Sequence, residues 1–413
     1  MRSSLALLVL TVAAAACAAP AEDGEDSAAA FTTDLRPELA QMNDVSILFP
    51  LATSKGAFDR GYLTPASAGR GGALITSEVY EKAFGPPGTL LGGGTSAAPK
   101  LAGLRLVAVR FDPCFAELQI RDESKCKNQI RLVFQTLSFD GKRTTAKDDA
   151  VHAFYSITRA ELEAAVGKMI ALRTKKVGEK RLGALGPHPL LKTTGGDLDV
   201  ATAAEVEGLV TSLAGPKNLV QFTQFATSAG GLAWNFSGFD TATGAFMPIP
   251  GLPAARNTRV AFFAGFETGT LSGEPAFNPA SEATGTDNLQ ALGNETSATA
   301  VGAATRAQGF QAMLRLENPT KHSPDTTDCA SCHAVEPIRK LVATKLFAGE
   351  MEKAVGAFAP DARFVPAEDL KQAANEEAGV DMHMFSYNGR VPSVHRRTIN
   401  ETAAVVAHLN ARR

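Results

Sequence analysis

The sequence predicts an α+β N-terminal region followed by a small all-α C-terminal domain. Between residues 31 and 290, strand patterns and helix patterns are mixed, and no clean internal repeat connects them. From 291 to 413 the periodic segments are amphipathic helices. A stretch rich in Gly, Ser, Thr and Asn at 267–297 separates the two parts, so we place a domain boundary near residue 290.

Alternating apolar and polar residues predict the strands of the first part. They lie at 45–51, 102–139 and 151–157 and, divided by turn residues, within 218–266. Because these segments are short and bounded by Gly, Pro, Asn and Asp, we expect them to form a sheet rather than buried helices.

Three helices are predicted among these strands. Residues 158–176 are amphipathic and begin with Thr158 and Glu161 at the spacing of a capping box. Residues 199–215 form a second helix that a Gly-Pro pair closes, and 76–84 form a shorter one.

The C-terminal domain is predicted to contain helices at 298–316 and 338–358 and a final helix at the end of the chain. Thr398 and Glu401 have the spacing of a capping box that opens the final helix. Its apolar residues at helical spacing are Ile399, Ala403, Val406 and Leu409.

The first 17 residues have the pattern of an export signal. Arg2 precedes an unbroken apolar run from Leu5 to Ala16, and small residues close that run. The run is too short for a bilayer core, which needs roughly twenty apolar residues. We therefore expect 1–17 to be a cleaved signal peptide and the mature chain to be exported, to the periplasm or the cell surface.

Two interpretations of Cys17 are open. Small residues followed by Cys resemble a bacterial lipobox, which would make this thiol the site of lipidation. The lipobox pattern prefers a branched aliphatic residue where Ala14 stands, so ordinary cleavage at an Ala-x-Ala site is the alternative. Residues 18–30 are acidic and lack large apolar side chains, as expected of a disordered tether behind a lipid anchor.

The overall charge excludes a general nucleic-acid-binding role. The chain has 41 Lys and Arg against 43 Asp and Glu, a net charge of -2. Cationic side chains gather locally at 390–397 and 339–345. Such a patch could dock an acidic partner protein, or it could be an ordinary solvated face.

The stretch DCASCHAVEP, 328–337, places two cysteines and a histidine within five positions. The chain has only 5 Cys and 7 His in 413 residues, so random placement would give this spacing in about one chain in a thousand. A redox dithiol would need a thioredoxin-like strand and helix, and structural zinc would need a second ligand pair at a fixed spacing. The sequence around the motif offers neither.

This stretch resembles the haem-attachment motif of c-type cytochromes. The resemblance implies that Cys329 and Cys332 form thioethers with one haem c (heme c) per chain, and that His333 is the proximal ligand of the iron. An export signal agrees with this family, which assembles its haem outside the cytoplasm. The Pro-containing loop before Cys329 departs from the family, in which the first helix usually runs almost directly into the motif.

The resemblance also implies a sixth iron ligand on a loop shortly before the C-terminal helix. We expect Met384, with Met382 and His383 as alternatives. In an extended backbone the two methionines share a face and His383 points the other way. Both methionines could instead be core residues against the porphyrin edge. Met351 and His322 are weaker candidates.

Cys114 and Cys126 remain once two cysteines are assigned to haem and one to lipid. Because strands are predicted on both sides of this pair, a disulfide between them would staple the connection in an oxidising compartment. Two separate buried thiols are the alternative. His152, on a predicted strand, is expected to be a structural residue. His395 is expected to lie on the surface or on a helix face.

These patterns predict an exported, lipid-anchored, mono-haem c-type cytochrome that transfers single electrons between redox partner proteins. Its membrane contact would be the lipid anchor alone. One alternative is a haem-containing oxidoreductase whose N-terminal domain binds a substrate, and another is a ligand-binding haem sensor. No Ser/His/Asp or paired-carboxylate arrangement indicates a separate catalytic site.

Overall fold

A computed structural model describes eleven parts of the chain. These are residues 38–84, 99–113, 127–227, 233–241, 259–262, 271–274, 292, 295–322, 329–350, 358–370 and 381–412. All of them belong to one compact unit, Asp34–Arg413. The predicted signal peptide, the tether, Cys17, Cys114, Cys126 and Met351 lie outside the described residues, and so does the expected boundary near residue 290.

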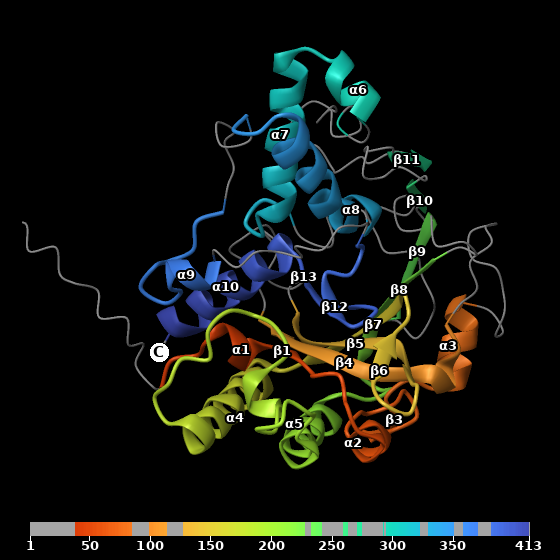
Figure 1. Cartoon of the computed structure of the whole chain (residues 1–413). Coiled ribbons are helices and arrows are strands. Elements are labelled where there is room, and N and C mark those ends of the chain that lie inside the picture. Colours follow the sequence, from red (N-terminus) through yellow and green to blue (C-terminus); the bar gives the residue numbers. More distant parts are fainter. Residues whose placement is uncertain are drawn as a thin grey trace, which may run out of the picture. The chain divides into compact units, whose positions relative to one another are not determined.

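An antiparallel sheet forms the centre of this unit (Figure 1). Among the described residues it has nine strands, eight of them in the order β1-β4-β5-β7-β8-β9-β10-β11, with β6 on β5. The sheet and the helices beside it confirm the predicted α+β character. The bounds are β1 Ser46–Leu48, β4 Leu104–Asp112, β5 Asn128–Phe139, β6 Thr144–Ala146, β7 Asp149–Ile157, β8 Leu219–Thr227, β9 Ala233–Asp240, β10 Arg259–Phe262 and β11 Leu271–Glu274.

Helices cover both faces of the sheet. Figure 1 shows α4 (Arg159–Val177) and α5 (Val200–Leu213) on one face, and α7 (Ala303–Glu317), α8 (Cys329–Arg339) and α10 (Arg396–Ala411) on the other. Because both faces of the central strands are covered, those strands are apolar nearly throughout; β4, for example, is buried at eight of its nine residues.

The helix predicted at 158–176 is confirmed as α4. Thr158 is its N-cap, and the hydroxyl of Thr158 accepts a hydrogen bond from the backbone N–H of Glu161, whose carboxylate bonds back to the N-cap. The helix predicted at 199–215 is confirmed as α5, capped by Asp199. The predicted short helix is α3, Ser77–Phe84.

Smaller elements complete the N-terminal region. They are α1 (Met42–Val45), which precedes β1, α2 (Lys55–Arg60), the two-stranded pair β2 (Ala68–Gly69) and β3 (Gly72–Ala73), and short 3-10 turns at Leu101–Gly103 and Pro189–Leu191. In the C-terminal region, α6 (Glu295–Ala300) precedes α7, a π-helical segment (Lys340–Leu346) continues α8, and α9 is Ala367–Leu370.

The C-terminal region is not all-α, contrary to expectation. A hairpin of β12 (Phe385–Asn388) and β13 (Val391–Val394) lies directly before α10. Its two-residue loop starts at Gly389, whose φ of 62° lies in the left-handed region that favours glycine. Each of these strands has only four residues, so the alternation of apolar and polar residues is too brief to indicate a strand in the sequence.

The capping box predicted at Thr398 and Glu401 is wrong. Because the hairpin ends at Val394, α10 begins at once with His395 as its N-cap. The hydroxyl of Thr398 donates to the carbonyl of Met384 instead, at 3.0 Å.

The C-terminal hairpin and helix pack directly against the sheet region. The side-chain amide of Gln135 on β5 donates to the carbonyl of Tyr387 at 2.6 Å, and the Tyr387 hydroxyl donates to the carbonyl of Phe49 at 2.6 Å. The side chain of Asn410 exchanges two hydrogen bonds of 2.9 Å with the backbone of Ala40. Residues from both ends of the described chain therefore share one core.

Glu207 on α5 gives the fold a specific pH dependence. Burial raises the pKa of this carboxyl to about 7, while the backbone N–H of Leu63 acts in the opposite direction. The folded state then holds a proton that the unfolded chain has lost, so stability falls as pH rises from about 4.5 through 7. We expect Glu207→Gln to gain about 1 kcal/mol at pH 8 relative to wild type, after allowance for partial exposure.

Urea denaturation at pH 5 and pH 8 measures this effect. Glu205→Gln on the same helix is the control, since Glu205 is exposed and pairs with Lys175. If the free energy of unfolding changes equally between pH 5 and pH 8 in wild type and in Glu207→Gln, the raised pKa of Glu207 is contradicted.

Candidate functional site

The C-x-x-C-H motif forms the start of α8. Cys329 is its first residue, and Cys329 and Cys332 are partly buried and not in a disulfide. His333 follows on the same helix with only 9% of its surface exposed. Pro337 lies inside α8, and the chain continues as the π-helical segment a turn later. The motif is thus held by a helix that the sheet region partly buries.

His333 is fixed through one of its two ring nitrogens. Its Nδ1 lies 2.6 Å from the carbonyl oxygen of Met382, so Nδ1 carries the proton and donates. Burial lowers the pKa of His333 to about 4, with His395 and His383 adding to the effect. The ring is therefore neutral at pH 7, and its Nε2 has a lone pair available for a metal ion.

Two aromatic side chains from the sheet pack against His333. The ring centre of Phe236 on β9 lies 5.1 Å from that of His333, and the ring centre of Phe225 on β8 lies 5.5 Å from it. Phe225 pairs with Phe236 across the two strands. These rings restrict the orientation of the imidazole and keep this side of it dry.

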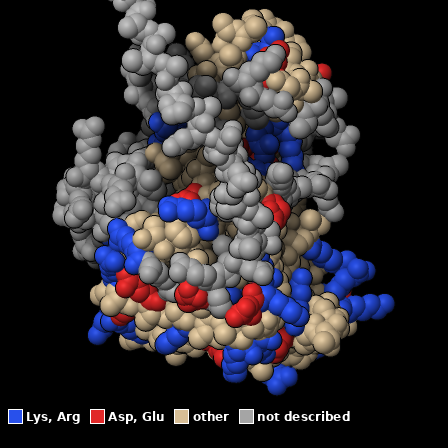
Figure 2. Space-filling view, turned by 90° about the vertical axis from the view of Figure 1, so that its left-hand side faces the viewer, with Lys and Arg blue, Asp and Glu red and all other residues tan. Residues whose placement is uncertain are grey.

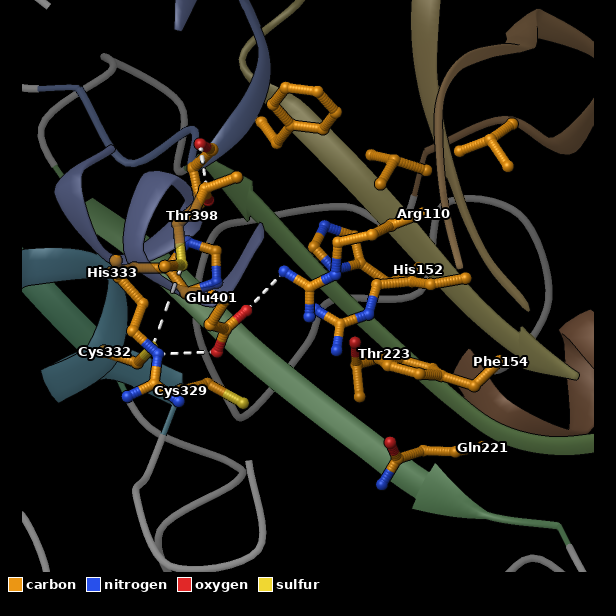
Figure 3. A pocket seen from close by; sticks show the side chains of 16 residues that line it. Arg110, His152, Phe154, Gln221, Thr223, Cys329, Cys332, His333, Thr398 and Glu401 are labelled. Carbon is orange, nitrogen blue, oxygen red and sulfur yellow. Dashed lines mark hydrogen bonds and ion pairs between the residues drawn. The ribbon is translucent and has the colours of Figure 1, made fainter. Parts of the chain in front are cut away.

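A pocket lies between α8, the hairpin, α10 and the sheet (Figure 3). Its empty space is about 880 Å³, a figure that includes space open to solvent. Its lining residues are Val109, Arg110, Arg131, Val133, His152, Phe154, Gln221, Thr223, Cys329, Cys332, His333, Met384, Phe385, Arg397, Thr398 and Glu401. Both cysteines and the histidine of the C-x-x-C-H motif therefore open into one cavity.

The sheet wall of this pocket consists of two rows of paired residues. Val133, His152 and Thr223 are neighbours across β5, β7 and β8. The next row, two residues further along each strand, is Arg131, Phe154 and Gln221. Side chains alternate along a strand, so these rows share one face of the sheet.

Charged side chains line the pocket beside α10. Arg110 and Arg397 both bind the carboxylate of Glu401, the latter at 2.6 Å. Burial opposes ionisation of Glu401, but Arg110 and Arg397 hold its pKa well below its usual range. With Arg131 the lining has three arginines, and the two carboxylates that bind them are Glu401 and Asp112, so one positive charge is left over to favour an anionic group.

Of the three sixth-ligand candidates, only Met384 lines the pocket. Its Sδ lies 3.8 Å from the Sγ of Cys332. Met382 is fully buried and contributes its carbonyl to His333 rather than its sulfur to the pocket. His383 is also fully buried and is not a lining residue.

His383 belongs to a separate acidic cluster. Its Nδ1 lies 3.0 Å from Asp381, and its Nε2 lies 3.6 Å from Asp148. Burial lowers the pKa of His383, but the two carboxylates outweigh this and raise it. Burial alone would raise the pKa of Asp381, yet bonds from His383 and Ser393 lower it to about 2.

Sequence reasoning missed two histidines near the site. His152 was expected to be structural, yet it lines the pocket opposite the motif. Alternation in 151–157 places His152 and Phe154 on one face of the strand. The sequence does not show that a cavity lies on that face. His395 was expected on the surface or a helix face, yet it is 1% exposed, because the hairpin leads it into the core.

The predicted cationic patch at 390–397 and 339–345 is not a uniform surface, since Arg390 is exposed and Arg397 is buried. Arg397 is 3% exposed, and Arg339 binds the buried carboxylates Glu317 and Glu336 at 2.6 and 2.5 Å. Figure 2 shows positive and negative side chains interspersed on the described part of another face. Arg339 and Arg397 therefore serve the fold and the pocket more than the outer surface.

Three further findings concern metal ions, membrane spans and similarity to known proteins. Among the described residues, no group of three or more His, Cys, Asp or Glu side chains could hold a metal ion. In the same residues, no helix has the length and hydropathy to cross a membrane. Searches against protein-family models, curated proteins and solved structures found no match.

The donor set of the pocket fits a covalently attached haem. Haem iron needs only one or two protein ligands, since the porphyrin supplies the others. Both thiols and the imidazole open into one cavity, and the Nδ1 bond leaves Nε2 for the iron. The positive charge left over among the arginines suits a propionate of the haem.

Proposed function

We propose that this protein is an exported, mono-haem c-type cytochrome that transfers single electrons. The observation that carries the proposal is that Cys329, Cys332 and His333 line one pocket, with the Nδ1 of His333 bonded to the carbonyl of Met382. A buried histidine whose second nitrogen bonds a carbonyl is the usual arrangement of a metal-ligating imidazole.

In this proposal the haem module is the C-terminal part, 291–413, completed by the sheet. Cys329 and Cys332 form the thioethers and His333 is the proximal ligand. Met384 is the sixth ligand that the sequence resemblance implies. The strands β5, β7 and β8 would form one wall of the haem pocket, which differs from a small cytochrome that encloses its haem alone.

When bound, the haem would supply one-electron chemistry at its iron. The protein residues hold it and set its surroundings. Arg131, whose Nε has no hydrogen-bond partner among the described residues, would pair with a propionate, while Phe225 and Phe236 keep water from His333. His333 stays neutral and so keeps its lone pair over the working pH range.

The remaining parts of the proposal concern location and partners. Export by the signal peptide, lipidation at Cys17 and a disulfide between Cys114 and Cys126 agree with one another, because all three require an extracytoplasmic compartment. The partners would be redox proteins. Since Arg339 and Arg397 are bound by buried carboxylates, docking of an acidic partner would use other cations.

The test is to produce the exported chain with the haem-attachment machinery and to titrate it electrochemically. We expect a haem c spectrum that changes reversibly with one electron per chain. A chain without haem, or with haem that cannot be reduced and reoxidised, would contradict the proposal. Rapid carbon monoxide uptake by the reduced form would favour the oxidoreductase or sensor alternatives.

A further inference from the structure

His152 lies across the pocket from His333. It comes from β7 in the middle of the sheet, whereas His333 comes from α8. The two ring centres are 6.2 Å apart, with 45° between the ring planes. Figure 3 shows His152 with Phe154 and Gln221 on one side of the pocket and the motif residues on the other.

This separation matches two imidazoles that share one metal ion. A metal–nitrogen bond is about 2.0 Å, and a ligating nitrogen lies about 1.2 Å from its ring centre, so two ligands in line give about 6.4 Å between ring centres. Axial ligand planes can adopt any mutual angle, so 45° is compatible. An ordinary contact between rings also covers this distance, and a second observation is therefore needed.

The second observation is that His152 has nothing else to bind. Among the described residues, its ring nitrogens have no hydrogen-bond partner. His188 shows the contrast, because one of its nitrogens lies 3.1 Å from the carbonyl of Asn43 and the other accepts from the N–H of Leu190 at 3.2 Å. Buried His395 also lacks a partner on either ring nitrogen among the described residues, but it does not line the pocket, whereas His152 does.

Met384 is less well placed than His152. Its sulfur touches the Sγ of Cys332, the atom that would join the edge of the haem. His152 instead faces the ring of His333, the ligand at the centre of the haem. An iron bound to His333 would thus have an imidazole rather than a thioether opposite to it.

We propose that His152 is the sixth ligand of the haem iron, so that the sheet region completes a bis-histidine centre. The inference rests on the proposed haem attachment. It also gives the α+β region a function, since one of its strands would supply a ligand to a cofactor held by the C-terminal region.

The test compares visible and electron paramagnetic resonance spectra of four holoproteins. They are wild type, His152→Ala, Met384→Leu and His395→Ala, the last a buried histidine outside the pocket lining. We expect low-spin ferric haem without the red-end band of Met-to-iron charge transfer in wild type. Only His152→Ala should become high-spin and, once reduced, bind carbon monoxide.

Two additions separate ligand loss from misfolding. Free imidazole should restore the low-spin spectrum of His152→Ala, which a merely unfolded variant would not show. His152→Met should raise the reduction potential, because His/Met ligation lies above His/His ligation.

The inference is overturned if wild type has the charge-transfer band and Met384→Leu abolishes it while His152→Ala keeps it. It is also overturned if reduced wild type binds carbon monoxide readily, or if His395→Ala is the variant that opens the site. In these cases the haem is present and its attachment stands, although carbon monoxide binding by wild type would also favour the oxidoreductase or sensor alternatives. Absence of haem from wild type overturns both.

Discussion

Replacing both motif cysteines, in Cys329→Ser with Cys332→Ser, is expected to abolish covalent haem attachment. Both thiols open into the same pocket, and neither is in a disulfide. Serine keeps the size of the side chain but cannot form a thioether. Haem staining of denatured protein should fall from a strong band to background, and each single variant should keep one bond.

Ser331→Ala is the matched control, because it changes the motif between the cysteines without removing a thiol. It should stain like wild type. A double variant that keeps haem through denaturation would show that these thiols are not the attachment points.

Loss of the Arg173–Asp44 ion pair should cause the largest loss of stability. Both side chains are fully buried, and the Nε of Arg173 donates to both oxygens of Asp44 at 3.1 and 3.0 Å. Asp44→Ala leaves the guanidinium without its counter-ion in the core. We expect it to reduce the free energy of unfolding by about 3–5 kcal/mol, measured by urea denaturation.

Asp59→Ala is the control for this prediction. Asp59 pairs with Lys55 on the surface of α2, where 48% and 68% of the two side chains are exposed. Such a pair contributes at most about 1 kcal/mol. If Asp44→Ala and Asp59→Ala lose similar stability, the buried Arg173–Asp44 pair does not stabilise the fold more than an exposed pair does.

Local patterns in the sequence predicted much of the α+β region. The capping box at Thr158 and Glu161 lies on the helix that it opens, since both partners are within one turn. The same spacing at Thr398 and Glu401 was misleading, because Glu401 binds Arg110 from a distant strand. Short-range motifs are reliable only where no long-range partner competes for their side chains.

The site itself could be predicted only in part. The C-x-x-C-H motif is contiguous and Met384 lies on the predicted ligand loop, so four of the pocket's residues were visible in the sequence. His152 and Arg131 reach the same cavity from separate strands, and only the register of the sheet brings them there. The local sequence of neither strand indicates that its side chains line a pocket together with residues of α8.

The central claim is that this chain carries one covalently bound haem at Cys329 and Cys332. The most direct measurement is the intact mass of the exported protein under denaturing conditions, followed by the mass of the peptide that contains the motif. We predict that both are heavier than the sequence alone by the mass of one haem. A mature chain and peptide with the unmodified mass would contradict the account.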